Sequence, residues 1–257
     1  MMHQIHQHFS FFSVMGYHPP VLDLLDFPFT VLIIIINVYI CYFLNTRNIP
    51  IESVAISATT YLDRKEYWRG VTASFSHYSL LHIIFNISSA WELRTLEKFI
   101  GIITFLKYIT LLVIFPPLLD SLIRKRFFPD RIPWAVGYSC VLCGLSAYTS
   151  LMFSYYTIFG IQIPWSIMPF IQIIITQLLV PQASLIGHLS GVLTGYAISW
   201  HLFDWFTNKL FLNTLPWIVL FYIHFYKRSH RDSFQWYEYS HDAPVNLVIQ
   251  GGVLRRT

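Results

Sequence analysis

Residues 132–203 read IPWAVGYSCVLCGLSAYTSLMFSYYTIFGIQIPWSIMPFIQIIITQLLVPQASLIGHLSGVLTGYAISWHLF and contain no Asp, Glu, Lys or Arg. A soluble domain has about 25% charged residues, so it does not normally contain a neutral run of this length. A helix that spans a bilayer needs about 20 apolar residues, so the run can hold about three such helices. This segment predicts that lipid is the solvent for this part of the chain.

The composition of the whole chain agrees with this prediction. Of its 257 residues, 55% are hydrophobic and 12% are charged, with a net charge of +4. The basic residues lie in short clusters between apolar segments, as at 124–126 and 227–228, which is typical of headgroup anchors and not of nucleic-acid binding. Residues 1–26 contain no Lys or Arg, which argues against a mitochondrial presequence and against a cleaved signal peptide. We therefore expect a multi-pass protein of an endomembrane, the ER or the Golgi.

The apolar segments predict an all-α polytopic membrane protein with six spans. We expect an N-terminal segment (1–26), a transmembrane domain (27–203) and a C-terminal tail (204–257). The tail contains one more apolar stretch, Leu210 to Phe225, which reads either as an interfacial helix or as a seventh span. The six predicted spans are residues 27–46, 79–96, 101–119, 136–158, 165–180 and 183–203, with a mixed loop at 48–78 and a basic loop at 121–131.

The three cysteines do not predict a disulfide or a metal site. Cys41 lies inside an apolar run, and Cys140 and Cys143 are one helical turn apart in another. No second cysteine pair is present to complete a zinc site. We expect no metal.

Polar side chains stand out in three of the predicted spans, where each is costly unless it faces the interior of the bundle. His82 and Asn86 share one face of the second span, Ser146 lies in the fourth, and His188 lies in the sixth. These alternate spans cross the membrane in the same direction. At about 1.5 Å per residue, the four residues lie roughly 5 to 15 Å below the same surface. We therefore expect them to converge.

Glycines favour a close approach of the fourth and sixth spans. Gly191 and Gly195 follow His188 on its face of the helix, and Gly144 precedes Ser146. A neutral histidine can take the proton of a serine hydroxyl, which activates that oxygen as a nucleophile. The donors available for an oxyanion are then Asn86, His82 and the backbone N–H of Ser146.

At these residues the sequence resembles the rhomboid protease family. The matching stretches are WR (68–69), HYSLLHIIFN (77–86), GLS (144–146) and GHLSGVLTG (187–195), in the order and at the spacing of the family. The resemblance implies a six-helix core that works without a metal or cofactor and cleaves transmembrane segments of single-span membrane proteins. It also implies that Trp68 and Arg69 belong to a loop lying in the outer leaflet. It assigns Ser146 as nucleophile, His188 as general base, His82 and Asn86 as oxyanion donors, and Gly144, Gly191 and Gly195 as supporting residues.

Positions near the proposed nucleophile depart from the family pattern under this assignment, as does Arg94, which replaces a usual small residue before Glu97 and Gly101. Ala147 follows the proposed nucleophile where the family usually has glycine, and Ser150 stands where many members have a tyrosine. These departures favour, as an alternative, a non-catalytic relative that binds membrane clients or helps to dislocate them. A channel or carrier would need titratable residues along a pore, and the neutral run offers only His188 and His201.

Overall fold

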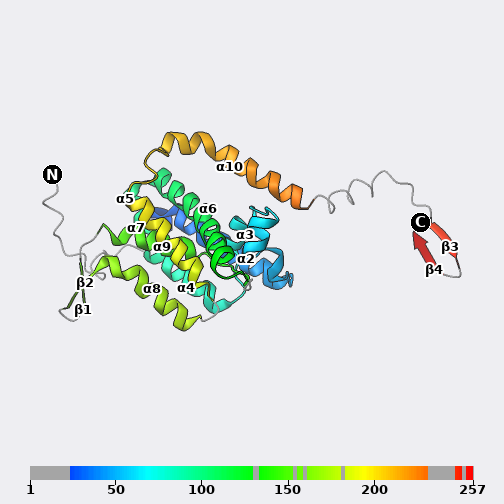
Figure 1. Cartoon of the computed structure of the whole chain (residues 1–257), viewed down its shortest axis with the longest axis horizontal. Helices are drawn as coiled ribbons and strands as arrows, with labels where there is room; N and C mark the ends of the chain where they lie inside the picture. The colour runs from blue at the N-terminus through cyan, green and yellow to red at the C-terminus, as the bar shows by residue number, and fades with distance from the viewer. Residues whose placement is uncertain are drawn as a thin grey trace.

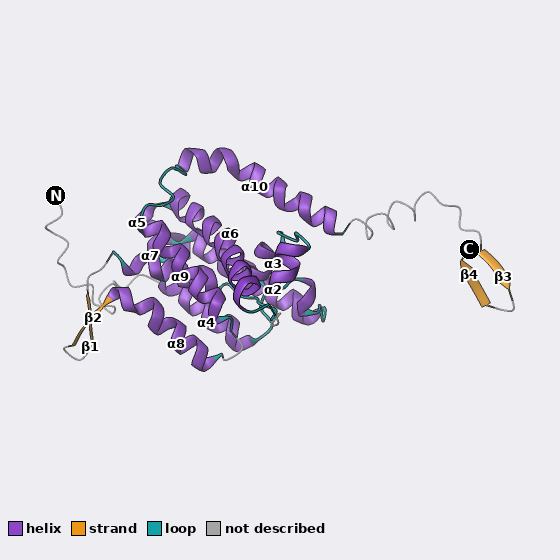
Figure 2. Ribbon diagram, viewed as in Figure 1, coloured by secondary structure: helices purple, strands orange, loops and turns teal. Residues whose placement is uncertain are grey.

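The computed structural model describes residues 24–129, 133–152, 155–158, 161–180, 183–230, 247–250 and 253–256. Helices form the bundle, and the described strands pair as two small antiparallel hairpins outside it (Figures 1 and 2). The N-terminal segment predicted at 1–26 lies outside the described residues up to position 23. The α-helices are α2 (Pro28–Thr46), α3 (Arg69–Phe75), α4 (Leu80–Glu92), α5 (Thr95–Ile100), α6 (Ile102–Phe127), α7 (Ser139–Ser150), α8 (Met168–Leu179), α9 (Leu185–Ser199) and α10 (Asn208–Ser229). The shorter elements are η1 (Ile51–Ser53), η2 (Thr59–Asp63), η3 (Trp165–Ile167), β1 (Tyr155–Ile158), β2 (Ile161–Pro164), β3 (Leu247–Gln250) and β4 (Val253–Arg256).

The long helices alternate in direction between two ends of the bundle. We call the "loop end" the one that carries residues 47–79, and the "hairpin end" the one that carries the β1–β2 hairpin. At the loop end, Gly137 just before α7 donates its N–H to the carbonyl of Ala73 at 2.8 Å. At the hairpin end, the Asn208 amide at the start of α10 donates to the Thr104 hydroxyl near the start of α6 at 2.9 Å. Helices α4, α7 and α9 therefore all begin at the loop end.

Helix α7 packs more closely on α9 than side chains would normally allow. A Cβ on Gly195 would lie 2.0 Å from the carbonyl oxygen of Gly144, and one on Gly191 would lie 2.1 Å from that of Cys140. A Cβ on Gly144 would lie 2.2 Å from a methyl group of Leu112 in α6. Only glycine permits these distances, so the predicted role of the three glycines in bringing the helices together agrees with the structure.

A buried carboxylate at the hairpin end holds the start of α2, a helix that has no side-chain cap of its own. Glu97 in α5 is 1% exposed and accepts bonds from the backbone N–H groups of Phe29 (3.0 Å) and Thr30 (2.9 Å). The Thr30 hydroxyl also donates to it at 2.8 Å. The first N–H groups of a helix have no intrahelical partner and favour negative charge, so Glu97 fixes α2 against the bundle.

The outer surface of the bundle is apolar. Two helices, α2 and α6, are long and apolar enough to cross a bilayer, and the apolar helices at Trp165–Leu178 and Leu185–Ser199 are shorter. Large hydrophobic side chains such as Ile35 of α2 and Leu178 of α8 point outward. This is the opposite of a water-soluble surface, and it agrees with the predicted helical membrane bundle.

Several predicted boundaries differ from the structure. The predicted loop at 121–131 is wrong for residues 121–127, because α6 continues through Pro116 and Pro117 to Phe127. The predicted span at 136–158 is shorter, because α7 ends at Ser150 and β-branched and aromatic residues form β1 instead. The predicted span at 79–96 is divided into α4 and the short α5.

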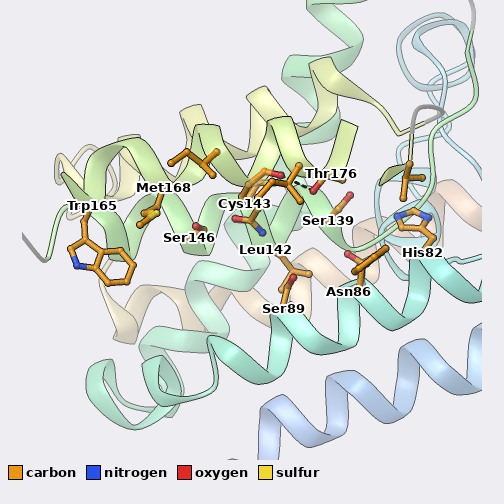
Figure 3. Close-up of a pocket in the computed structure, with 15 residues that line it drawn as sticks. His82, Asn86, Ser89, Ser139, Leu142, Cys143, Ser146, Trp165, Met168 and Thr176 are labelled. Carbon is orange, nitrogen blue, oxygen red and sulfur yellow. Dashed lines mark hydrogen bonds between the residues drawn. The ribbon is translucent and has the colours of Figure 1, made fainter. Parts of the chain in front are cut away.

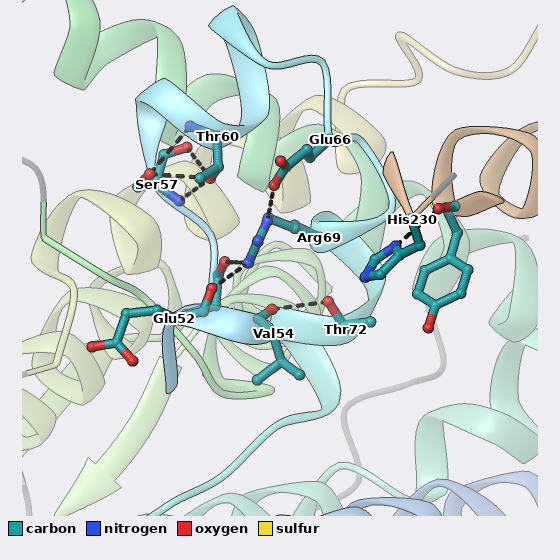
Figure 4. A network of polar contacts seen from close by, with 10 residues as sticks. Glu52, Val54, Ser57, Thr60, Glu66, Arg69, Thr72 and His230 are labelled. Carbon is teal, nitrogen blue, oxygen red and sulfur yellow. Dashed lines mark hydrogen bonds and ion pairs between the residues drawn. The ribbon is translucent and has the colours of Figure 1, made fainter. Parts of the chain in front are cut away.

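Arg69 organises the loop end. Its guanidinium donates to the backbone carbonyls of Glu52 (2.7 Å) and Ala55 (2.8 Å) and forms an ion pair with Glu66 (Figure 4). Thr72 adds a bond to the carbonyl of Val54 at 2.8 Å. These contacts fold the polar and aromatic segment 52–72 into a compact structure beside the start of α7.

Helix α10 joins the two ends of the bundle. It starts beside α6 at the hairpin end and extends toward α3 along the upper edge of Figure 1. Its last turns stack on the loop end: the ring of Phe221 lies 6.0 Å from Tyr67, and that of Tyr226 lies 5.3 Å from Trp68. The predicted stretch Leu210 to Phe225 is thus part of one continuous helix, Asn208–Ser229, in spite of Pro216.

Candidate active site

Ser139 is the first residue of α7, and the chain reaches it through a turn that requires glycine. Gly137 has a φ of +120°, a conformation that side chains disfavour. A Cβ there would also lie only 2.5 Å from the ring of His82. Both facts mean that only glycine fits at position 137. The bend of the chain at Gly137 places Ser139 at the start of α7.

His188 lies in the first turn of α9, directly across from Ser139. Its Nε2 forms a hydrogen bond with the Ser139 hydroxyl at 2.8 Å. The imidazole is 1% exposed, and its Nδ1 has no hydrogen-bond partner among the described residues. A serine and a histidine therefore form a pair without a third polar member in the described part of the chain.

The structure does not form the predicted pair of Ser146 and His188. Ser146 follows Ser139 by seven residues, two turns farther along α7, and the Ser146 hydroxyl has no hydrogen bond in the described structure. The backbone N–H of Ser146 lies in the middle of the helix, where it bonds within the helix and is not free for an oxyanion.

The sequence contained a signal for Ser139 that our prediction missed. Gly137-Tyr138-Ser139 has the same Gly-x-Ser pattern as Gly144-Leu145-Ser146. Because α7 begins at Ser139 and α9 at Leu185, Ser139 and His188 both lie in first turns at the loop end. Ser146 is about 10 Å deeper, at about 1.5 Å per residue. Depth along the helix distinguishes the two serines, and the pattern alone does not.

His82 and Asn86 lie beside Ser139, as the sequence predicts for two residues on one face of a helix. The Asn86 side-chain nitrogen is 2.8 Å from Nε2 of His77, and the ring of His77 lies 5.0 Å from that of His82. His82 Nε2 is buried and has no partner among the described residues. His82 and Asn86 therefore present nitrogen groups next to the serine.

His77 is fully buried between α4 and the start of α7. Its Nε2 accepts from the side chain of Asn86 and, at 3.4 Å, from the backbone N–H of Tyr138. Burial lowers the pKa of His77 to about 3, so the ring stays neutral and Nε2 can accept both bonds. His77 holds Asn86 in place relative to the serine.

A cavity of about 410 Å³ opens beside these residues, between α4, α7 and the η3–α8 segment (Figure 3). Its polar lining includes His82, Asn86, Ser139 and Ser146, while most of the rest is apolar, including Trp165 and Met168. Ser146 thus lines the same cavity as Ser139, at a greater depth. The cavity offers room for an extended chain beside the Ser139 hydroxyl.

The described residues contain no group of three or more His, Cys, Asp or Glu that could hold a metal ion. Cys41, Cys140 and Cys143 are free thiols.

Comparison with known proteins gives a consistent match. A family model described as the Rhomboid domain matches residues 64–205, more than half of the chain. Rhomboid-like protein 15 of Arabidopsis thaliana is 30% identical over 168 residues, which make up 59% of this chain and 40% of that protein. Rhomboid-type serine protease 2 of Saccharomyces cerevisiae is 27% identical over 158 residues, 56% of this chain and 55% of that protein.

A third relative, Rhomboid-like protein 14, mitochondrial, of Arabidopsis thaliana, is 29% identical over 140 residues, 51% of this chain and 42% of that protein. The chain therefore spans about half or less of the length of these relatives. The residues matched by the Rhomboid domain model, 64–205, contain α4, α7 and α9, the helices that carry the site.

Proposed function

Because the chain belongs to the rhomboid family of membrane proteins, we propose that it is an intramembrane serine endopeptidase with Ser139 as nucleophile and His188 as general base. The observation that carries this proposal is the 2.8 Å hydrogen bond between the two side chains, one from α7 and one from α9. The family includes proteins named as serine proteases. The assignment replaces Ser146, which lacks this contact.

The first step would be attack on a peptide carbonyl. His188 Nε2 accepts the proton of the Ser139 hydroxyl as the oxygen bonds to the carbonyl carbon, and this produces a tetrahedral oxyanion. The protonated imidazole then gives the proton to the leaving amine, and the acyl group stays on Ser139. Water, deprotonated by His188, releases the acyl group and restores the serine.

Three groups around Ser139 can stabilise the oxyanion. The N–H of Ser139 lies in the first turn of α7, where helical N–H groups have no intrahelical acceptor and negative charge is favoured. The Asn86 amide and the His82 ring line the same cavity. Donors fixed in place before the reaction stabilise the developing charge without reorganisation.

The membrane setting defines the class of substrate. Rhomboid-family membership implies membrane proteins as substrates or clients. We propose single-span proteins, whose chain would enter the mostly apolar cavity between α4 and α8 in extended form. With Ser139 as the nucleophile, the two positions become Cys140 and Cys143, which also differ from the family's glycine and tyrosine. The labelling test below therefore also decides between the catalytic and the non-catalytic function.

We also propose that α10 crosses the bilayer as a seventh helix and that the protein resides in the ER or the Golgi. Helix α10 has 22 residues, or about 33 Å at 1.5 Å per residue, and this length matches a bilayer, although its sequence is less apolar than those of α2 and α6. Imaging of a tagged protein against organelle markers tests the location, and protease protection of a tag after α10 tests the crossing.

The decisive test uses purified protein in liposomes with a fluorophosphonate, a reagent that labels activated serines. We expect wild type to label and to cleave a single-span substrate, and Ser139→Ala and His188→Ala to do neither. Ser146→Ala is the matched control, since its serine lies on the same helix and lines the same cavity. We expect Ser146→Ala to keep the label.

The other outcomes have clear meanings. If Ser146→Ala loses the label and Ser139→Ala keeps it, the assignment of Ser139 is wrong. If folded wild type neither labels nor cleaves any of several substrates, the chain is a non-catalytic member that binds clients.

A further inference from the structure

A buried ion pair lies in α6 near the loop end. Neither of its residues lines the cavity that Asn86 lines. Asp120 and Arg124 are one helical turn apart and are 5% and 8% exposed. The Arg124 Nε lies 3.0 and 2.9 Å from the two carboxylate oxygens of Asp120. Burying both charges in an apolar bundle is costly, and well-packed hydrophobic residues are often at least as stable in such places. Stability alone therefore does not account for the pair.

The pair contacts one further side chain, Ser184. Arg124 donates from Nη2 to the Ser184 hydroxyl oxygen at 2.7 Å, and the hydroxyl donates to Asp120 at 3.3 Å. Ser184 is the N-cap of α9, because its hydroxyl oxygen also accepts the N–H of Gly187 at 3.0 Å. The ion pair thus fixes the orientation of the residue that starts α9.

The next residue after Gly187 is His188. Its backbone N–H donates to the carbonyl of Ser184 at 3.0 Å. The hydroxyl and the carbonyl of Ser184 therefore both accept N–H groups from the first turn of α9. That turn also lies tightly against α7, since a Cβ on Gly187 would be 3.1 Å from the sulfur of Cys140. A chain of hydrogen bonds runs from Asp120 and Arg124 through Ser184 to the backbone of His188, whose ring bonds Ser139.

We propose that Asp120, Arg124 and Ser184 are positioning residues that hold His188 at the distance and angle needed to take the proton of Ser139. The proposal rests on the proteolytic function proposed above. A base that shifts by about 1 Å can lose about 100-fold in rate, so small displacements of the first turn of α9 matter. The ion pair acts through the helix cap, and neither Asp120 nor Arg124 lines the 410 Å³ cavity.

The main test replaces the whole ion pair. Asp120→Leu combined with Arg124→Met removes both charges and leaves no unpaired one, so the protein should fold with a thermal midpoint near or above that of wild type. We expect kcat to fall by about 10- to 100-fold with KM within about twofold, and the fluorophosphonate labelling rate to fall in parallel. A purely structural role would lower the thermal midpoint instead.

Two further variants isolate the cap. Ser184→Ala should reproduce the loss of kcat, and Ser184→Thr, which keeps the hydroxyl, should restore most of it. The matched control is the exposed ion pair of Lys125 with Asp63, which involves the next residue of the same helix. Lys125→Gln should keep the kcat of wild type.

Hydrogen exchange gives a readout that does not depend on activity. We expect the amides of Gly187 and His188 to exchange faster in Ser184→Ala and in the double variant than in wild type. Unchanged exchange, or a wild-type kcat in the folded double variant, would overturn the positioning role. A third outcome is that the variants exchange faster than wild type but wild type neither labels nor cleaves. That outcome would refute the proposed function and leave the link from the ion pair to α9 established.

Discussion

The two Gly-x-Ser motifs at α7 have the same sequence pattern but occupy different positions in the folded helix. Gly137-Tyr138-Ser139 begins the helix, and its serine bonds His188. Gly144-Leu145-Ser146 lies in the middle of the helix, and its glycine packs against α6 and α9. The start of a helix offers free N–H groups and an exposed turn, whereas the middle offers only a face for packing. Position along the helix therefore decides which serine can do chemistry.

The difference between Ser139 and Ser146 is tested most directly by removing each serine and measuring substrate cleavage. We expect Ser139→Ala to lower kcat by about 10⁴-fold or more, because loss of the nucleophile abolishes the covalent route. Ser146→Ala should change kcat by less than about tenfold and act mainly on KM, since the side chain lines the cavity. Equal losses in the two variants would remove the distinction between the motifs.

A second prediction concerns the donors beside the first motif. Asn86→Ala should lower kcat by about 100- to 1,000-fold at nearly constant KM, which is typical of the loss of one oxyanion donor. Ser89→Ala is the matched control, because Ser89 lines the same cavity one turn farther along α4. If Asn86→Ala raises KM alone, then Asn86 binds substrate and does not stabilise the oxyanion.

A third prediction compares the two glycines. Gly137→Ala combines a strained backbone with a contact of 2.5 Å to His82, so it should disturb the site and lower kcat by about 100-fold. Gly144→Ala should instead weaken the contact of α7 with Leu112 and lower the thermal midpoint more than kcat. The measurement is kcat and thermal unfolding in detergent for both variants. A larger kcat loss in Gly144→Ala would contradict the comparison.

The smallest expected effect is at the hairpin end, far from both motifs. Glu97→Gln removes the charge that caps α2 and should lower the free energy of unfolding by about 1 to 2 kcal/mol. The kcat of the folded fraction should stay that of wild type, since Glu97 touches no residue of the site. Denaturant titration and cleavage assays on the same preparation check both parts.

Much of the fold could be predicted because lipid imposes simple rules on composition. The uncharged run at 132–203, the glycines of α9 and the His82–Asn86 face all predicted features that the structure has. Helix ends could not be predicted, because Asp120 and Arg124 neutralise each other and let α6 extend to Phe127. Hydropathy likewise did not separate the end of α7 from the strand at Tyr155–Ile158.

The site could be predicted only in part. The histidine and asparagine positions depended on helical periodicity, which the sequence expresses directly. The choice of serine depended on the first residue of α7, and the turn at Gly137 that sets it is recognised only from its φ and its contact with His82. Both serines stand in a Gly-x-Ser pattern, so the sequence pattern alone did not separate Ser146 from Ser139.

The course of α10 has a consequence for where products go. Its last turn stacks on Trp68, which belongs to the same end of the bundle as Ser139. With α10 crossing the bilayer as proposed above, that end of α10 and the end of the bundle that carries Ser139 face one aqueous compartment. A fragment freed at Ser139 toward the water would enter this compartment, so a reporter fused behind α10 identifies the side of the membrane on which the signal appears.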